Sequence, residues 1–114
     1  MQTYESIQQI EHLKATKAVL ILFGGPQCGV CHAIKPKLFS LISQQYPEIV
    51  MAYVDCAESP DVCAQHNVFS LPVVQLYIEG RLYLERARSV SLVELGSEIE
   101  RIYRLWKPDS TELR

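Results

Sequence analysis

Residues 23–32 read FGGPQCGVCH, and they connect an apolar run to an amphipathic one. The four residues before them, VLIL at 19–22, are all strand formers, and the glycines and the proline that follow end the strand. A helical pattern of apolar residues starts at the first cysteine. The sequence therefore predicts a strand, a short turn and a helix, with Cys28 at the helix N-terminus.

The spacing of Cys28 and Cys31 is that of a pair that can form a disulfide. Unpaired backbone N–H groups and the helix dipole favour an anion at a helix N-terminus, so the Cys28 thiol should ionise more readily than an ordinary one. Cys31 lies three residues further on, almost one turn along the same side of the helix. The two sulfurs can then switch between dithiol and disulfide.

The composition is that of one globular domain. The chain has 114 residues, of which 48% are apolar and 21% charged, and this argues against a disordered or a membrane protein. The apolar run at 18–23 is far too short to span a bilayer. We predict a single domain over residues 1–114, with a mobile tail at about 108–114.

Charge and the first residues narrow the expected partners and location. The net charge is −2 and both signs are interspersed, so neither nucleic acid nor a membrane is an expected partner. Residues 1–5 lack the basic stretch and the long apolar core of a secretory signal. We therefore expect a cytoplasmic protein.

Periodicity predicts the other elements. Helices are expected at 6–14, from Cys28 to just before Pro47, at 61–66 and from Ser91 to Trp106, and strands at 19–22, 49–54, 73–78 and 81–84, with a weaker one at 2–4. The turn at 79–80 is tight, so the last two strands should pair antiparallel. We predict an α/β fold with a central mixed sheet of four to five strands, flanked by four helices in three α/β/α layers.

Two residues inside the predicted helices mark special positions. Pro36 lies a little more than one turn after Cys31, and a proline there removes a backbone hydrogen bond, so we predict a kink in the helix. Trp106 continues the apolar face of the last helix and is expected in the core. The apolar face of the earlier helix turns Cys31 towards the core and leaves Cys28 at the exposed tip.

With these features in place, the chain resembles the thioredoxin superfamily over nearly its whole length. The resemblance rests on CGVC at 28–31, on Pro36 five residues further, on Leu71-Pro72, and on Gly80 at the hairpin. Leu71-Pro72 looks like the cis-proline of this family and lies at the family's distance from the second cysteine. The four features in register are far more specific than a CxxC motif alone.

The resemblance implies a protein disulfide oxidoreductase that acts mostly as a reductase and needs no cofactor and no metal. In the family's cycle, the Cys28 thiolate attacks the substrate disulfide, a mixed disulfide forms, and Cys31 resolves it. The substrate is expected to dock on the residues around this pair: Leu71, cis-Pro72, Gln27, Gly29 and Val30. The implied partners are disulfide-containing proteins and an unidentified reductant such as a thioredoxin reductase, and the implied state is a monomer.

Several residues depart from the thioredoxin pattern. The family's buried aspartate would fall at Leu22 and its lysine partner at Tyr53, so the proton of Cys31 needs another acceptor, such as water or the leaving thiolate. The usual aromatic residues before the motif are replaced by Gly24 and Gln27, which predicts a flatter and less apolar docking rim. We expect weak transfer to a general disulfide such as that of insulin, and narrower or different partners.

Cys56 and Cys63 form a second pair, with six residues between them. The pair resembles the CxxxxxxC that follows a VDC strand end in some disulfide isomerase domains, where it makes a structural disulfide. A reducing cytosol opposes such a bridge. Two buried thiols are the alternative, because free cysteine behaves as a small hydrophobe.

The same residues fit other functions less well. Residues 28–32 also spell CxxCH, but haem attachment needs export and a mainly helical shell, and the cysteines with His32 and His66 lack the short spacing of a zinc knuckle. An alternative of another class is a binding module with weak catalysis, whose disulfide is a redox switch for one partner. The apolar Leu22 favours it, whereas the retained cysteines and Pro72 oppose it.

Overall fold

The computed structural model of the chain describes residues 2–4 and 6–107. Its elements are β1 (Gln2–Thr3), α1 (Ile7–Thr16), β2 (Ala18–Gly24), α2 (Gly29–Gln45), β3 (Ile49–Asp55), α3 (Pro60–Gln65), β4 (Val73–Ile78), β5 (Arg81–Ala87) and α4 (Leu92–Trp106). The expected mobile tail at 108–114 lies outside the described residues.

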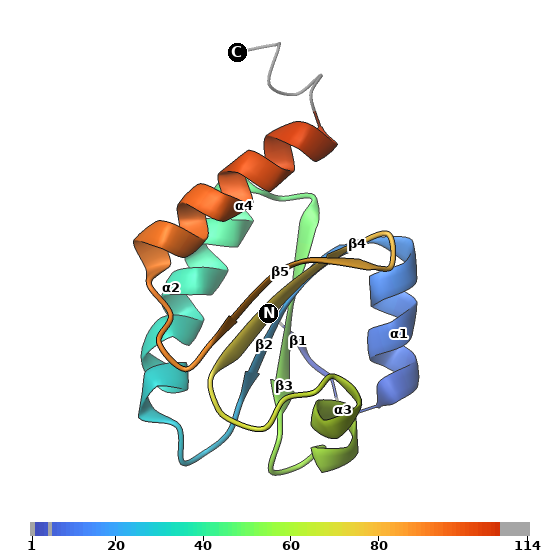
Figure 1. Cartoon of the computed structure of the whole chain (residues 1–114), viewed down its shortest axis with the longest axis vertical. Coiled ribbons are helices and arrows are strands. Elements are labelled where there is room, and N and C mark those ends of the chain that lie inside the picture. Colours follow the sequence, from blue (N-terminus) through green and yellow to red (C-terminus); the bar gives the residue numbers. More distant parts are fainter. Residues whose placement is uncertain (1, 5, 108–114) are drawn as a thin grey trace.

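The strands form one mixed sheet in the order β1-β3-β2-β4-β5 (Figure 1). Strands β1, β3 and β2 are parallel, whereas β4 pairs antiparallel with both β2 and β5. Every residue of the central strand β2 is buried. This agrees with its unbroken apolar sequence, since strands covered on both faces do not alternate with polar residues. The predicted α/β fold, with a mixed sheet flanked by four helices, is confirmed.

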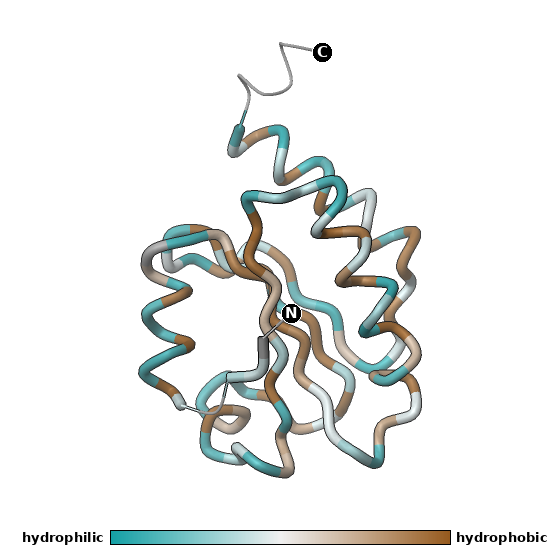
Figure 2. The backbone as a smooth tube through the Cα atoms, turned by 180° about the vertical axis from the view of Figure 1, so that it is seen from behind, coloured by the Kyte–Doolittle hydropathy of each residue, from teal (hydrophilic) through white to brown (hydrophobic). Residues whose placement is uncertain are grey.

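Helices cover both faces of the sheet, with α2 and α4 on one side and α1 and α3 on the other (Figure 1). Successive side chains of a strand point to opposite faces, so β2 serves two cores. Leu20 and Leu22 pack with α2 and α4, while Val19, Ile21 and Phe23 pack on the opposite side. In Figure 2 the strands at the centre are mainly hydrophobic, whereas the helices alternate between hydrophobic and hydrophilic residues.

The ends of some elements differ from the predictions. Strand β5 continues to Ala87 instead of ending at 84, because its backbone stays paired with β4 although its side chains there are polar. Helix α3 begins one residue earlier, at Pro60, which suits the first turn because proline needs no N–H partner there. Helix α1 extends to Thr16, two residues past the predicted end.

Pro36 and Trp106 lie where the helical patterns placed them. Pro36 is inside α2, whose assigned residues run on past it, and the kink stays a prediction. Trp106 is only half-buried, packed against the core cluster at the end of α4, so its expected place in the core is reached only in part. The ring centre of Trp106 lies 6.0 Å from that of Tyr103, which in turn lies 5.0 Å from that of Tyr46. The three rings are on the same side of the sheet.

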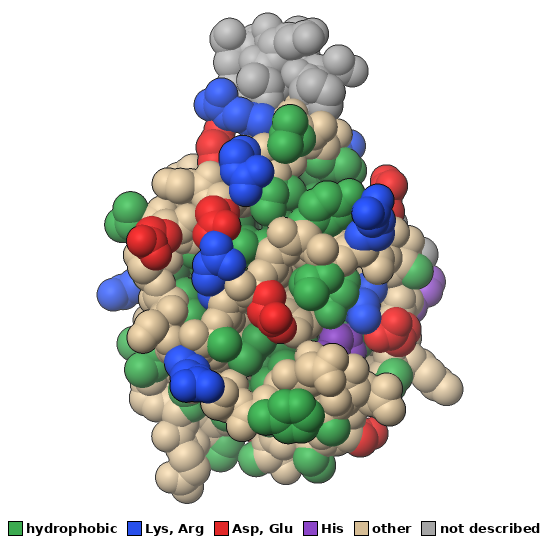
Figure 3. Space-filling model, in the orientation of Figure 1, with side chains coloured by type: hydrophobic (Ala, Val, Ile, Leu, Met, Phe, Trp, Pro, Cys, Tyr) green, Lys and Arg blue, Asp and Glu red, His purple; other side chains and the backbone are tan. Residues whose placement is uncertain are grey.

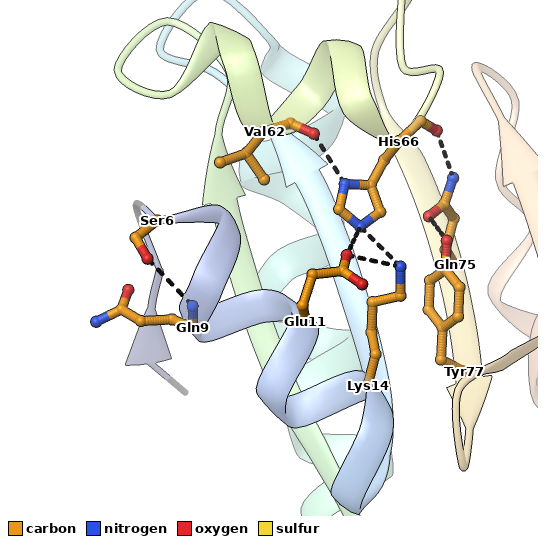
Figure 4. A network of polar contacts seen from close by, with 8 residues as sticks. All are labelled: Ser6, Gln9, Glu11, Lys14, Val62, His66, Gln75 and Tyr77. Carbon is orange, nitrogen blue, oxygen red and sulfur yellow. Dashed lines mark hydrogen bonds and ion pairs between the residues drawn. The ribbon is translucent and has the colours of Figure 1, made fainter.

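A partly buried polar cluster lies between α1, α3 and β4, with His66 and Gln75 buried and Glu11 exposed at its edge (Figure 4). Its side chains are those of Glu11, Lys14, His66, Gln75 and Tyr77. His66 Nδ1 lies 2.8 Å from the carbonyl oxygen of Val62, which fits an N–H donor at this position. Nε2 then accepts from Lys14 Nζ at 3.2 Å. Nε2 also lies 3.5 Å from a carboxylate oxygen of Glu11, so a proton gained at Nε2 would meet the Lys14 ammonium and the Glu11 carboxylate together.

We expect the His66 cluster to make stability depend on pH. Burial, aided by the nearby Lys14 cation, holds the pKa of His66 below its ordinary value, although the Val62 hydrogen bond and the Glu11 carboxylate oppose this. The unfolded chain therefore takes up a proton on His66 at a higher pH than the folded one. The stabilisation is complete above pH ~6.5 and is lost as the pH falls below that value.

The measurement is the free energy of unfolding in urea between pH 7.5 and 5, for wild type and His66→Gln. The wild type should lose stability more steeply on acidification than the variant, which has no group to protonate at this position. His32→Gln, at an exposed position on α2, is the matched control for removing a histidine. Equal slopes for wild type and His66→Gln would contradict the prediction.

Candidate active site

Cys28 and Cys31 lie at the start of α2, as the sequence predicted. Cys28 is the N-cap residue, and its sulfur accepts a hydrogen bond from the backbone N–H of Cys31 at 3.2 Å. The two sulfurs form a disulfide, with 5.3 Å between the Cα atoms. Cys28 is half-buried, whereas Cys31 is 1% exposed. A partner can therefore reach only the first sulfur, and that sulfur faces the N–H groups that stabilise a thiolate.

The turn between β2 and α2 is held by backbone hydrogen bonds. The N–H of Cys28 donates to the carbonyl of Gly25 at 3.1 Å, and the N–H of Cys56 donates to the carbonyl of Gly24 at 2.8 Å. Gly24 is packed so closely that a Cβ atom there would lie 2.9 Å from the Tyr53 hydroxyl and 3.1 Å from the Cys31 Cβ. A larger residue at 24 would therefore displace one of these two side chains.

Leu71 and Pro72 lie beside the cysteines, and the peptide bond between them is cis. The carbonyl of Pro72 accepts a hydrogen bond from the N–H of Arg88 at 2.7 Å, which ties the loop to the end of β5. Within residues 2–4 and 6–107, no main-chain hydrogen bond uses Leu71. Its backbone is therefore available to pair with an extended segment of a partner.

A groove of about 400 Å³ lies between the turn before α2 and the loop before β4. Its lining residues are Gly25, Pro26, Gln27, Cys28, Ala57, Phe69, Ser70 and Leu71. The groove thus brings together two of the predicted docking residues, Gln27 and Leu71, and the accessible Cys28. Val30 lies on the other side of Cys28, in a second groove with residues 88–91 and Glu94. Gly29 is exposed as the first residue of α2.

Phe69 is a site residue that the sequence analysis missed. Its side chain is 81% exposed although it is large and apolar, and it forms one wall of the groove that contains Cys28. It therefore adds an aromatic surface to the rim that we expected to be flatter and less apolar. No periodicity marks a single apolar residue in a loop, and only its place three residues before Pro72 could have indicated it.

The positions where the family has its aspartate and lysine hold Leu22 and Tyr53, which are neighbours in the parallel pair of β2 and β3 and form the floor of the site. Both are buried, and Leu22 is 0% exposed. The ammonium of Lys35, one turn after Cys31 on α2, lies 3.8 Å from the centre of the Tyr53 ring. Burial, with the carboxylate of Asp55 adding to it, raises the pKa of Tyr53. The tyrosine hydroxyl is therefore protonated at neutral pH.

Of the two states left open for Cys56 and Cys63, the structure has the disulfide, with 5.7 Å between the Cα atoms. Cys56 is half-buried just after β3, and Cys63 is buried in α3. Because Ala57 follows Cys56 and lines the groove, the bridge holds the back of the groove to α3.

The remaining polar residues offer no second centre in the part of the chain that the structure describes. No three of its His, Cys, Asp and Glu side chains lie together as a metal site. His32 is exposed, and His66 belongs to the polar cluster of Figure 4. None of the described helices has the length and hydropathy of a membrane span. Figure 3 shows positive and negative side chains interspersed on the face that it presents.

The fold and the site together define a thioredoxin-like oxidoreductase fold that carries a redox-type disulfide. The family model described as Thioredoxin matches residues 3–100, and the chain belongs to the thioredoxin family. Members of this family are generally disulfide oxidoreductases.

Individual relatives agree with this assignment. The chain is 32% identical over 108 residues to the thioredoxin-like protein YdfQ of Bacillus subtilis, covering 94% of this chain and 96% of that protein. It is 40% identical over 68 residues to thioredoxin-2 of Pyricularia oryzae, covering 60% of this chain and 39% of that protein. The oxidised form of mitochondrial thioredoxin 3 from Saccharomyces cerevisiae has the same fold, with a TM-score of 0.80 at 24% identity, over 89% of this chain and 94% of that one.

Proposed function

We propose that this protein reduces disulfides of other proteins by cycling the Cys28–Cys31 pair between dithiol and disulfide. The observation that carries the proposal is the placement of this pair: Cys28 is accessible at the N-terminus of α2 and lines a groove, while Cys31 is buried directly behind it. Nucleophilic attack needs an accessible thiolate, and release of the substrate from the mixed disulfide needs a second thiol within bonding distance.

One cycle transfers two electrons from the protein to the substrate disulfide. The Cys28 thiolate attacks one sulfur of the substrate disulfide, a mixed disulfide forms, and the other substrate sulfur leaves as a thiolate that takes up a proton. The Cys31 thiol loses its proton and attacks Cys28, which releases the second substrate sulfur. The substrate gains two electrons and two protons, and the protein is left with the Cys28–Cys31 disulfide.

The groove also supports a mode of docking. An extended segment of the substrate can form backbone hydrogen bonds with Leu71, as in strand addition, and this brings its disulfide to Cys28. Phe69 offers an apolar contact beside the attacked disulfide, and Val30 offers another in the second groove, with residues 88–91. The substrate class is thus a protein disulfide in an extended segment with an apolar residue close to the cysteine.

The proposal extends to partners and location. A separate reductant, such as a thioredoxin reductase, must return the pair to the dithiol form after each cycle, since the reaction leaves it oxidised. We propose a monomer that acts on proteins in the cytoplasm and has neither nucleic acid nor a membrane as a partner.

Trapping with Cys31→Ser tests the proposal. Without the resolving thiol, the mixed disulfide should persist, and substrates should remain linked to Cys28 on a non-reducing gel. Cys28→Ser/Cys31→Ser is the matched control, which should capture nothing through this site. A Cys31→Ser protein that captures no disulfide-linked protein in cells, together with a wild type that reduces no protein disulfide in vitro, would refute the proposal.

A binding module with weak catalysis is the second candidate, and the apolar Leu22 beneath Cys31 favours it. In that case the oxidised and reduced forms would bind one partner with different affinities, while the wild type would show little turnover. Slow reduction of insulin by itself does not separate the two candidates. Turnover on a protein captured by Cys31→Ser does, because only the oxidoreductase reduces it repeatedly.

A further inference from the structure

The Tyr53 hydroxyl and the side chain of the buried Cys31 both pack against Gly24. A Cβ atom on Gly24 would be 2.9 Å from this hydroxyl and 3.1 Å from the Cys31 Cβ, so both groups border the same small space above Gly24. The absence of a side chain at 24 is what allows Tyr53 to reach this point. Among residues 2–4 and 6–107, the Tyr53 hydroxyl makes no side-chain hydrogen bond. Its proton is therefore available to a neighbouring sulfur.

Lys35 fixes the tyrosine ring from the other side. Its ammonium lies 3.8 Å from the ring centre, within the range of a cation–π interaction. Lys35 follows Cys31 by four residues on α2, so the two side chains lie on the same face of the helix. The helix that carries the cysteine therefore also holds the ring beside it.

Cys31 needs such a neighbour for the resolving step. It is 1% exposed, and a thiolate at a buried position is disfavoured unless a hydrogen-bond donor or a cation lies near it. Its floor contains no acid that could take the proton, because Leu22 is apolar. The carboxylate of Asp55 is engaged in the turn after β3, where its Oδ1 accepts hydrogen bonds from the N–H groups of Ala57 and Glu58.

We propose that the Tyr53 hydroxyl donates a hydrogen bond to the Cys31 thiolate and so promotes the resolving step, with Lys35 holding the ring in position. This inference rests on the proposed function and concerns its second half-reaction alone. The hydroxyl keeps its proton throughout. The proton of Cys31 passes to water or to the departing substrate sulfur, and the Cys31 electron pair forms the bond to Cys28.

The charged and titratable groups around this pair are few. Lys35 comes from α2, Asp55 from β3, and Cys28 from the helix start. Strand β2 contributes no charged group, but the carbonyl oxygen of Phe23 lies 4.0 Å from the Cys31 sulfur and can accept its proton in a hydrogen bond. Burial raises the pKa of Tyr53, so the hydroxyl keeps its proton and remains a donor at neutral pH. The positive charge of Lys35 also favours the Cys31 thiolate over the thiol.

A single-turnover reaction with an aromatic disulfide, 5,5′-dithiobis(2-nitrobenzoate), separates the two half-reactions. Attack by Cys28 releases one coloured thiolate, and attack by Cys31 on the mixed disulfide releases the second. In Tyr53→Phe we expect the first release to be unchanged and the second to slow about tenfold at pH 7, with its pH midpoint raised by about one unit. Loss of packing alone would not move that midpoint.

Two further variants serve as a control and as a second test of the same step. Tyr77→Phe removes a buried hydroxyl on the opposite face of the sheet and should leave both releases as in the wild type. Lys35→Met should slow the second release about threefold, and it tests the same step if Tyr53→Phe does not fold. A wild type without a second release would refute the proposed function and this inference with it. A normal wild type, with variants at 53 and 35 that keep its midpoint, would refute the inference alone.

Discussion

Replacing Cys28 with serine is expected to lower the rate of disulfide reduction to that of the uncatalysed reaction. The exposed sulfur at the start of α2 is the group that attacks in the proposed cycle, and the buried Cys31 cannot take over because its side chain is 1% exposed. A serine hydroxyl has about the same size but does not ionise near neutral pH, so the helix N-terminus has no anion to stabilise.

The rate is measured with reduced protein and a fluorescent peptide disulfide, with dithiothreitol regenerating the dithiol. Cys31→Ser, reduced beforehand and then freed of dithiothreitol, is the informative comparison, since it should react once, at nearly the wild-type rate, and then stop as the mixed disulfide. Cys56→Ser/Cys63→Ser should retain turnover, because this pair is bonded away from the start of α2. Residual turnover in Cys28→Ser that disappears in the variant lacking the second pair would instead place the reaction at Cys56.

Much of the fold could be predicted from local patterns. The apolar run of β2, the Ser91–Glu94 capping contact and the face of α4 each depend on neighbouring residues, and all three occur in the structure. The end of β5 could not be predicted in this way. Its last residues have polar side chains and are held by pairing with β4, which is a contact between segments that sequence periodicity does not report.

In the candidate site, too, some residues could be predicted from local sequence and others could not. The placement of Cys28 follows from a strand, a turn and a helix that adjoin one another in the chain, so the sequence predicted it. Phe69 and Tyr53 reach the site from a loop and a strand far along the chain, and neither belongs to a local motif. The resemblance directed attention to Tyr53 only as a missing lysine. The position of its hydroxyl depends on the close packing around Gly24, a contact between segments that no local pattern reports.

Introducing the family's acid at Leu22 is expected to destabilise this protein rather than improve it. Leu22 is 0% exposed on the central strand, and its neighbour across β3 is Tyr53, which cannot pair with a carboxylate as a lysine could. We expect Leu22→Asp to lower the free energy of unfolding by about 3 kcal/mol or more at pH 7, because it buries an unpaired charge in place of a packed side chain.

The pH dependence separates the charge from the lost packing. Burial raises the pKa of the new carboxyl, so below pH ~4 it is neutral in both states and the variant suffers only from the polar substitution. The penalty then grows as the pH rises towards the folded-state pKa and is constant above it. Leu22→Asn, which cannot ionise, should show a loss that does not change with pH relative to wild type.

The double variant Leu22→Asp/Tyr53→Lys tests whether a lysine at 53 can stabilise the introduced carboxylate. If the apolar floor is a matched pair, an acid and a lysine introduced together should lose less stability than the sum of the two single changes, because each charge then has a partner at the adjoining position of β2 and β3. Urea unfolding of the four proteins at pH 7 measures this coupling. Additive losses would contradict the expectation that the two introduced charges stabilise each other across β2 and β3.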